Sequence, residues 1–316
     1  MGRFLLRRLG FALLLVLVVS SASLLLTRIA PSEIELDPAA RARLRAELGL
    51  DRPFVVQYAD WLAGAVRFDF GRSVLYGRPV STLVGERALN TAVLAFTALL
   101  VATLIGIPLG IYSGTETRGL ARALIRAASV LAISVPPLVG SLALVFLAAR
   151  TGWMPVGGMT STAGLDLSWG AWLADVARHL PVPALALAIP LAASLERLQS
   201  QSMEAASRER YVAAGRARGL TRMTALLRHA WPNSLRPVLG LYGVMIGALF
   251  SGSFIVEVVT SWPGLGRLMF EALRARDLFL VAGCAATGAL FLAAGTLVAD
   301  VLMALTDPRV SSGERT

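Results

Sequence analysis

The chain has 316 residues, of which 56% are hydrophobic, and its formal net charge is +10. It is too apolar for a soluble protein of this length, and its single cysteine, Cys284, excludes a disulfide framework or a cysteine metal site. In so apolar a chain, basic excess indicates loops on the cytoplasmic side of a membrane rather than nucleic-acid binding. We expect Cys284 to be a small packing residue.

Six charge-free apolar runs follow one another along the chain. A helix that spans a membrane needs about 20 apolar residues. Five runs reach or approach that length, whereas the fourth is shorter and holds three prolines. The runs cover residues 9–27, 88–115, 127–149, 179–195, 237–256 and 278–299. The sequence therefore predicts an all-α membrane protein with six transmembrane helices.

The N-terminal run is predicted to stay as the first transmembrane helix. A cleaved signal peptide is the alternative, because three arginines precede the run and Ser21-Ala22-Ser23 resembles a cleavage site. After it, capping signals predict short helices over about 38–49 and 53–63, the latter ended by Gly64. The expected divisions are an N-terminal end with the first helix (1–28), an extracytoplasmic segment with short helices (29–87), a core of five helices (88–306) that includes a cytoplasmic loop (196–236), and a cytoplasmic tail (307–316).

Arginine counts decide the orientation of the chain. Six spans place both termini on one side of the membrane. Leaving out the long 28–87 segment, that side holds 16 arginines and the other side holds 5. Basic loops stay in the cytoplasm, so both termini are predicted to be cytoplasmic.

Two runs contain prolines at positions where a helix would bend. They are IGIPLG at 105–110 and ISVPPLVG at 133–140. Proline removes a backbone hydrogen bond and bends a helix. Bends that only improve packing and bends that act as moving hinges are both consistent with the pattern.

The apolar runs carry no ionisable residue near their centres, because Glu196, Glu257 and Asp300 all fall near run ends. A carrier coupled to protons or sodium usually needs an intramembrane carboxylate or histidine. The sequence also has no HExxH motif, no Ser/His/Asp set and no GxxxxGK[ST] phosphate loop. We therefore expect no enzyme activity and no bound metal, and any ATP would be used by a partner.

The loop RYVAAGRARGLTRMTALLRHAWPNSLRP (210–237) holds six arginines and no acid. Its residues suit helix, interrupted at Gly215 and at Gly219, with a new helix starting near Thr221. The small residues before Gly219 would let a partner's backbone approach closely. The alternative is a solvated loop that only fixes orientation.

This loop resembles the cytoplasmic loop of ABC importer permeases, whose pattern is E-A-A, three residues, Gly, nine residues, then I-x-L-P. Ala213-Ala214-Gly215 occupies the triplet, Gly219 the glycine and His229-Ala230-Trp231-Pro232 the closing element. Ala213 departs from the glutamate and His229 from the isoleucine. A literal Glu-Ala-Ala at 204–206 is out of register with Gly219.

Further segments resemble the B-type subunit of dipeptide, oligopeptide and nickel importers. They are RLRAELGLDRPFVVQYADWL (43–62), DFGRSV (69–74), IGIPLG, ISVPP, SFIVEVVTSWPGLGRLMFEALRARD (253–277) and ALTDPRV (304–310). The resemblance implies a six-helix type I importer permease in a bacterial or archaeal plasma membrane. Its implied partners are a second permease, two ATPase subunits that hold ATP and magnesium, and an extracytoplasmic solute-binding protein.

The resemblance assigns the ATPase-coupling role to Tyr211, Ala213, Ala214, Gly215, Arg216, Arg218, Gly219, His229, Pro232 and Asn233. Polar residues inside the runs are candidates for the translocation path, although hydrogen bonding to their own helices is the more frequent role of such residues. They are Asn90, Thr91, Ser134, Ser141, Ser251 and Ser253. Trp262, Pro263, Gly264 and Gly266 are predicted to form an outer turn.

The substrate stays open at this stage. Peptides are the first expectation, and nickel or another small solute is the alternative within the same class. A stand-alone channel or receptor without an ATPase is the rival from another class.

Overall fold

The computed structural model describes residues 53–115, 119–161 and 168–306, together with Gly10, Leu14, Leu17, Val18 and Ser21. In these ranges the regular elements are helices, and one isolated antiparallel bridge joins Arg72 to Pro79. The all-α fold class is therefore confirmed. The predicted first helix, apart from those five positions, the short helix at 38–49 and the tail at 307–316 lie outside the described residues.

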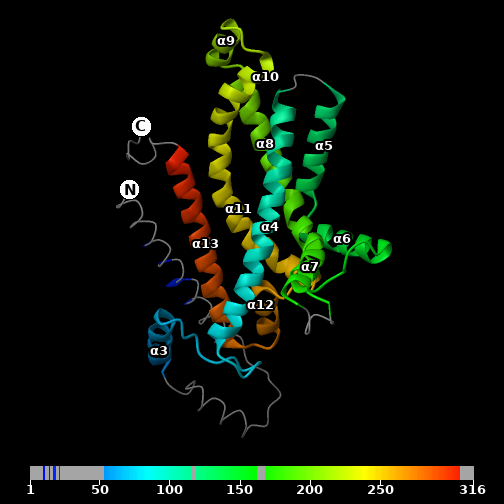
Figure 1. Ribbon diagram of the computed structural model, residues 1–316. Coiled ribbons are helices and arrows are strands. Elements are labelled where there is room, and N and C mark those ends of the chain that lie inside the picture. Colours follow the sequence, from blue (N-terminus) through cyan, green and yellow to red (C-terminus); the bar gives the residue numbers. More distant parts are fainter. Residues whose placement is uncertain are drawn as a thin grey trace. The chain divides into compact units, whose positions relative to one another are not determined.

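Figure 1 labels the helices in chain order. They are α3 (Phe54–Val66), α4 (Val80–Thr115), α5 (Leu120–Ser134), α6 (Pro137–Thr151), α7 (Trp169–His179), α8 (Pro181–Ser207), α9 (Arg210–Ala217), α10 (Arg222–Ala225), the π-helix η2 (Leu226–Ala230), α11 (Trp231–Val259), α12 (Leu265–Arg274) and α13 (Leu278–Thr306).

Three described helices, α4, α8 and α13, are long and apolar enough to cross a membrane, and the described residues hold up to five spans if each of two bent helix pairs counts as one. Helices over the runs 88–115, 179–195 and 278–299 are thus confirmed. The helix α8 is longer than its run and ends at Ser207. Pro181 and Pro183 do not interrupt it, because both fall in its first turn, where proline is tolerated.

The prediction of one helix over 127–149 is wrong. The chain forms α5 and α6 instead, and their axes differ by 105°. Val135 has φ −82° and ψ 117°, because a residue before proline is disfavoured in the helical region. Pro136 is also extended, and Pro137 then begins α6. Two consecutive prolines therefore break this run rather than bend it.

Two compact units make up the chain. The first, the core unit, comprises the described parts of Ala92–Trp262 and the end of α13 from Ala294. The second, the cap unit, comprises α3, the chain from there to Thr91, and Pro263–Ala293.

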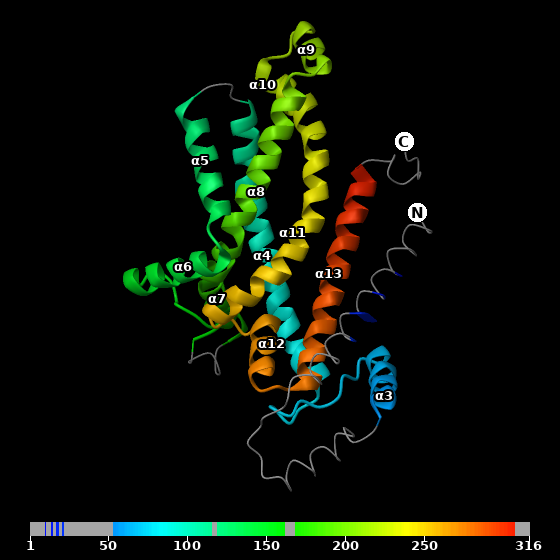
Figure 2. The same ribbon diagram turned by 180° about the vertical axis from the view of Figure 1, so that it is seen from behind.

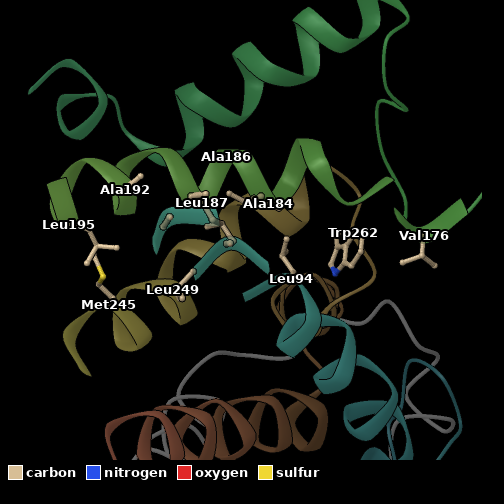
Figure 3. Packing of buried hydrophobic residues seen from close by; sticks show 14 of the residues in the cluster. Leu94, Val176, Ala184, Ala186, Leu187, Ala192, Leu195, Met245, Leu249 and Trp262 are labelled. Atoms are coloured by element: carbon tan, nitrogen blue, oxygen red, sulfur yellow. The ribbon is translucent and has the colours of Figure 1, made fainter. Parts of the chain in front are cut away.

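The core unit is built on α4, α8 and α11. Figure 3 shows Leu94, Leu187 and Leu249 pointing toward one another from these three helices. Several of the neighbouring buried residues on α8 are alanines, which bring the helix axes close together. The buried residues of this cluster include Leu94, Ala98, Ala102, Ala184, Leu187, Ala188, Ala192, Leu195, Met245, Leu249 and Trp262.

Three glycines on α4 lie against α8, at four-residue spacing. A Cβ atom on Gly106 would lie 2.5 Å from the Ala192 carbonyl oxygen, and one on Gly114 would lie 2.6 Å from the Ser200 carbonyl oxygen. Gly110, between them, would meet Gln199 at 2.6 Å. Real Cβ atoms do not approach this closely, so only glycine allows this packing.

Glu196 directly follows the predicted run 179–195 but lies in the middle of α8, because the helix continues to Ser207, and it is only 1% exposed. Its carboxylate accepts a hydrogen bond of 2.5 Å from Ser113 Oγ on α4. Nearby, Gln199 Nε2 donates to Ser234 Oγ on α11 at 2.8 Å. Polar side chains therefore join the same three helices that the apolar cluster joins.

In the cap unit, α3 continues past Gly64 to Val66. The prediction that Gly64 ends this helix is therefore wrong. The loop after α3 is held by Asp277, which is 1% exposed. Asp277 accepts hydrogen bonds from Ser73 Oγ at 2.6 Å and from the Leu75 amide at 3.0 Å. Its other oxygen accepts from the Leu280 amide at 3.1 Å, at the start of α13.

Tyr76 provides a second contact between the same loop and the α12 region. Its hydroxyl donates to Glu271 Oε2 at 2.6 Å. Burial and this hydrogen bond raise the pKa of Tyr76 to about 12, so the contact persists at any physiological pH.

Replacing Asp277 with alanine is expected to release the 69–79 loop from α13. Three donors lose a charged acceptor, and the free energy of opening this loop should fall by about 3 kcal/mol. Amide hydrogen exchange at residues 73–76 measures this free energy of opening. Asp69→Ala is the matched control, since Asp69 accepts only the Gly71 amide in this loop. Equal protection in both variants would contradict the anchoring role of Asp277.

Candidate functional site

The arginine-rich loop, residues 208–230, connects α8 to α11 and is shorter than the expected 196–236 because both helices extend into that range. Figures 1 and 2 show it as a compact turn of short helices beyond the ends of α8 and α11. It has its own apolar core, in which Val212, Leu226 and Ala225 pack against Met203 of α8. The loop therefore holds a fixed shape.

Gly219 ends α9 by a Schellman motif. Its φ is +92°, a left-handed conformation that side chains disfavour. The Gly219 amide donates to the Arg216 carbonyl at 2.9 Å, and the Leu220 amide donates to the Gly215 carbonyl at 3.3 Å. Thr221 then caps α10 by accepting from the Thr224 amide at 3.2 Å. The expected helix end at Gly219 and the new start near Thr221 are confirmed.

The prediction that Gly215 interrupts the helix is wrong. Gly215 is a buried residue inside α9. A Cβ atom there would lie 3.1 Å from His229 Cδ2, so Gly215 allows close contact with the chain's own η2 segment. Nothing lies within 4 Å of a Cβ atom built on Gly219. The two glycines therefore serve packing and backbone conformation within the loop, whereas Ala213 and Ala214 are exposed.

The exposed face of the loop combines small and basic side chains. Arg216, Ala217 and Arg218 are exposed alongside the two alanines. Tyr211 is 38% exposed, and its partial burial raises the pKa of its hydroxyl. The surface available to a partner is thus positively charged and has little side-chain bulk at its centre.

The closing element of the loop packs against α9 through His229. His229 packs on Gly215, and Asn233 Nδ2 donates to the His229 carbonyl at 2.8 Å. The chain forms the π-helix η2 before α11, and Pro232, which has no N–H, is the second residue of α11. A π-turn at this point is consistent with the missing donor, and such turns occur often at functional sites.

Glu204, at the end of α8, is the centre of a charge network that the sequence did not reveal. Arg122 Nη2 and Arg126 Nη2 of α5 donate to its Oε2 at 2.7 and 3.2 Å, and Arg208 Nη2 donates to its Oε1 at 2.8 Å. Arg222 donates to the Thr115 carbonyl at the end of α4, at 2.8 Å. Arg208 and Arg222 thus attach the loop to the ends of α8 and α4, and Arg122 and Arg126 join α5 to the same end of α8.

The predicted path residues contact their own chain. Asn90 Nδ2 donates to the Pro263 carbonyl at 2.8 Å, and Thr91 Oγ1 accepts from the Leu265 amide at 2.8 Å. Ser134 and Ser141 donate to carbonyls in their own helices. Ser253 is buried, and the side chain of Ser251 lies outside the described residues. Their assignment to the path stays a prediction.

Of the residues predicted to form an outer turn, three lie between α11 and α12, whereas Gly266 lies inside α12. Trp262 is fully buried in the core unit. Pro263 and Gly264 lead into α12, of which Gly264 is the N-cap and Gly266 a buried residue. Asn90 and Thr91 fix this turn within the cap unit.

Comparison with known proteins identifies the family of this chain. Residues 106–312 match the family described as the binding-protein-dependent transport system inner membrane component, and residues 1–79 match the N-terminal region of such membrane components. The chain belongs to this family of ABC importer permeases.

Relatives match the permease from end to end. It is 30% identical to an oligopeptide transport system permease protein of Bacillus subtilis, over 98% of this chain and 99% of the relative. It is 32% identical, with the same coverage, to a putative peptide transport system permease protein of Brucella abortus and to an oligopeptide transport system permease protein of Mycobacterium bovis.

Family membership fixes the general setting of the permease. It is a multi-pass inner membrane component of a transport system that depends on a binding protein, and its partners therefore include a solute-binding protein and an ATPase. Its relatives are transport proteins rather than enzymes.

Proposed function

We propose that the permease is the transmembrane subunit of an ATP-driven importer of dipeptides or oligopeptides. It forms half of the translocation path, together with a second permease of the same kind. The family match supports the importer, and the names of the relatives support a peptide substrate over nickel.

The observation that carries the proposal is the geometry of α9. An exposed eight-residue helix with a small, basic face is held on a loop that has its own apolar core and is attached to the ends of α4 and α8. A partner surface can approach Ala213 and Ala214 closely, and acidic groups on it can pair with Arg216 and Arg218. We assign this face to docking of the partner ATPase.

Closure of the ATPase pair on ATP would then move α9 together with the helices attached to it. The two permease halves would rock between inward-facing and outward-facing states. ATP drives this change only because the two states differ in affinity for it.

The proposed assembly holds two permeases, two ATPase subunits and one extracytoplasmic binding protein. ATP and magnesium bind to the ATPase subunits, and the permease itself binds no cofactor. Both termini and the arginine-rich loop lie in the cytoplasm, in agreement with the distribution of arginines.

Gentle solubilisation of tagged permease from its native membrane tests this assembly. Mass spectrometry should recover an ATPase, a second permease and a solute-binding protein, and the binding protein can then be screened with peptides and nickel chelates. A known ABC importer purified in parallel is the control. Recovery of the permease alone, while the control stays intact, would favour the stand-alone channel or receptor.

A further inference from the structure

A cavity of about 270 Å³ lies at the root of the arginine-rich loop. The ends of α4 and α8, the start of α5, and both short helices α9 and α10 contribute to its wall. Its lining residues are Gly114, Thr115, Arg122, Glu204, Ser207, Arg208, Val212, Arg216 and Arg222. Figures 1 and 2 show these helix ends together at one end of the core unit. The cavity therefore lies where long apolar helices end.

The lining is strongly cationic. It holds four arginines and one carboxylate, Glu204. Glu204 is already paired with Arg122 and Arg208, and also with Arg126, which does not line the cavity. Its negative charge is thus compensated within the network, and Arg216 and Arg222 leave an excess of positive charge facing the cavity.

We propose that this cavity binds a phosphate group. Guanidinium groups donate paired hydrogen bonds that fit the oxygens of phosphate, and they keep their charge at any physiological pH. Basic pockets at the cytoplasmic ends of membrane helices suit the head groups of anionic phospholipids. A phospholipid of the inner leaflet and a soluble phosphate are therefore the two sources of this group.

The test uses purified, delipidated permease in a non-ionic detergent, without its partners. Native mass spectrometry measures retention of phosphatidylglycerol against diacylglycerol with the same chains, and a titration measures binding of inorganic phosphate. We expect selective, saturable binding of a phosphate-bearing probe. Arg216→Gln should weaken it about tenfold, since one charge-assisted pairing is lost.

Arg228→Gln is the matched control, because Arg228 is an exposed arginine of the same loop that does not line the cavity. Its affinity should stay within about twofold of the unchanged permease, since only long-range attraction is lost. Arg216→Gln also leaves the contacts of Glu204 intact. Binding of the lipid alone identifies the membrane as the source, and binding of inorganic phosphate identifies a soluble one. Equal retention of both lipids with no phosphate binding, or equal loss in both variants, would overturn the site.

Discussion

Replacing Gly219 with valine is expected to lower ATP-driven uptake by about tenfold or more while the permease remains in the membrane. At φ +92° an L-residue is strained by about 1–2 kcal/mol, and a β-branched side chain by more. That strain opposes the Schellman motif, and a shift of this size changes a conformational equilibrium about 5–30-fold. The end of α9 would then move away from the position in which we propose that it docks on the ATPase.

Two controls separate backbone strain from other causes. Gly219→Asn should keep most of the uptake, because asparagine tolerates the left-handed region better than other residues. Gly152→Val introduces the same kind of strain at φ +64°, at the end of α6 and with open space around it. It should reduce uptake far less than Gly219→Val, because α6 is not part of the loop.

The measurement is uptake of a labelled peptide by cells, normalised to the amount of permease in the membrane. Unchanged uptake in Gly219→Val would show that the end of α9 does not matter for coupling. Equal loss in Gly152→Val would mean that the strain acts through general instability.

Local signals predicted the helix boundary inside the arginine-rich loop well, although not where the loop itself begins and ends. A glycine followed by threonine marked both the end of α9 and the start of α10, and the structure has both features. Such signals work because capping is decided by a few neighbouring backbone groups. Gly215 is also a glycine but lies inside the helix. It allows close packing against His229, which is fourteen residues later in the chain, and a local signal cannot show such a contact.

Features that depend on distant residues were missed or misjudged. The run ending before Glu196 suggested that a charge must lie near a membrane surface. The helix continues through this position, where Ser113 of α4 donates a hydrogen bond to the buried carboxylate of Glu196. Arg122 and Glu204 lie 82 positions apart, so no periodicity in the sequence reveals that they pair.

The proline signals did not distinguish a helix that continues from one that breaks. Pro108 and Pro190 lie inside the continuous helices α4 and α8, whereas Pro136 and Pro137 produce a turn of 105°. The difference arises because the second of two adjacent prolines also excludes the first from the helical region. In IGIPLG the glycines, rather than the proline, determine how closely α4 approaches α8.

Replacing Gly106 with leucine is expected to destabilise the core unit by about 3 kcal/mol, at the upper end of the usual cost of overpacking. Its Cβ atom would lie 2.5 Å from the Ala192 carbonyl oxygen and 2.8 Å from Leu195 Cβ. Both belong to α8, so the two helices would have to separate. Thermal unfolding followed by tryptophan emission measures the effect, since Trp262 is fully buried in the same cluster.

Gly85→Leu is the matched control, because Gly85 lies in the same helix and a Cβ atom there has nothing within 4 Å. Leucine is a better helix former than glycine by up to about 1 kcal/mol, so this variant should be as stable as the unchanged permease or slightly more so. If the melting temperature falls in Gly106→Leu but stays the same or rises in Gly85→Leu, the effect of the contact with α8 is separated from that of helix propensity. A Gly106→Leu variant with an unchanged melting temperature would mean that α4 and α8 can move apart at little cost. They would then be too loosely packed to transmit the motion that we propose for α9.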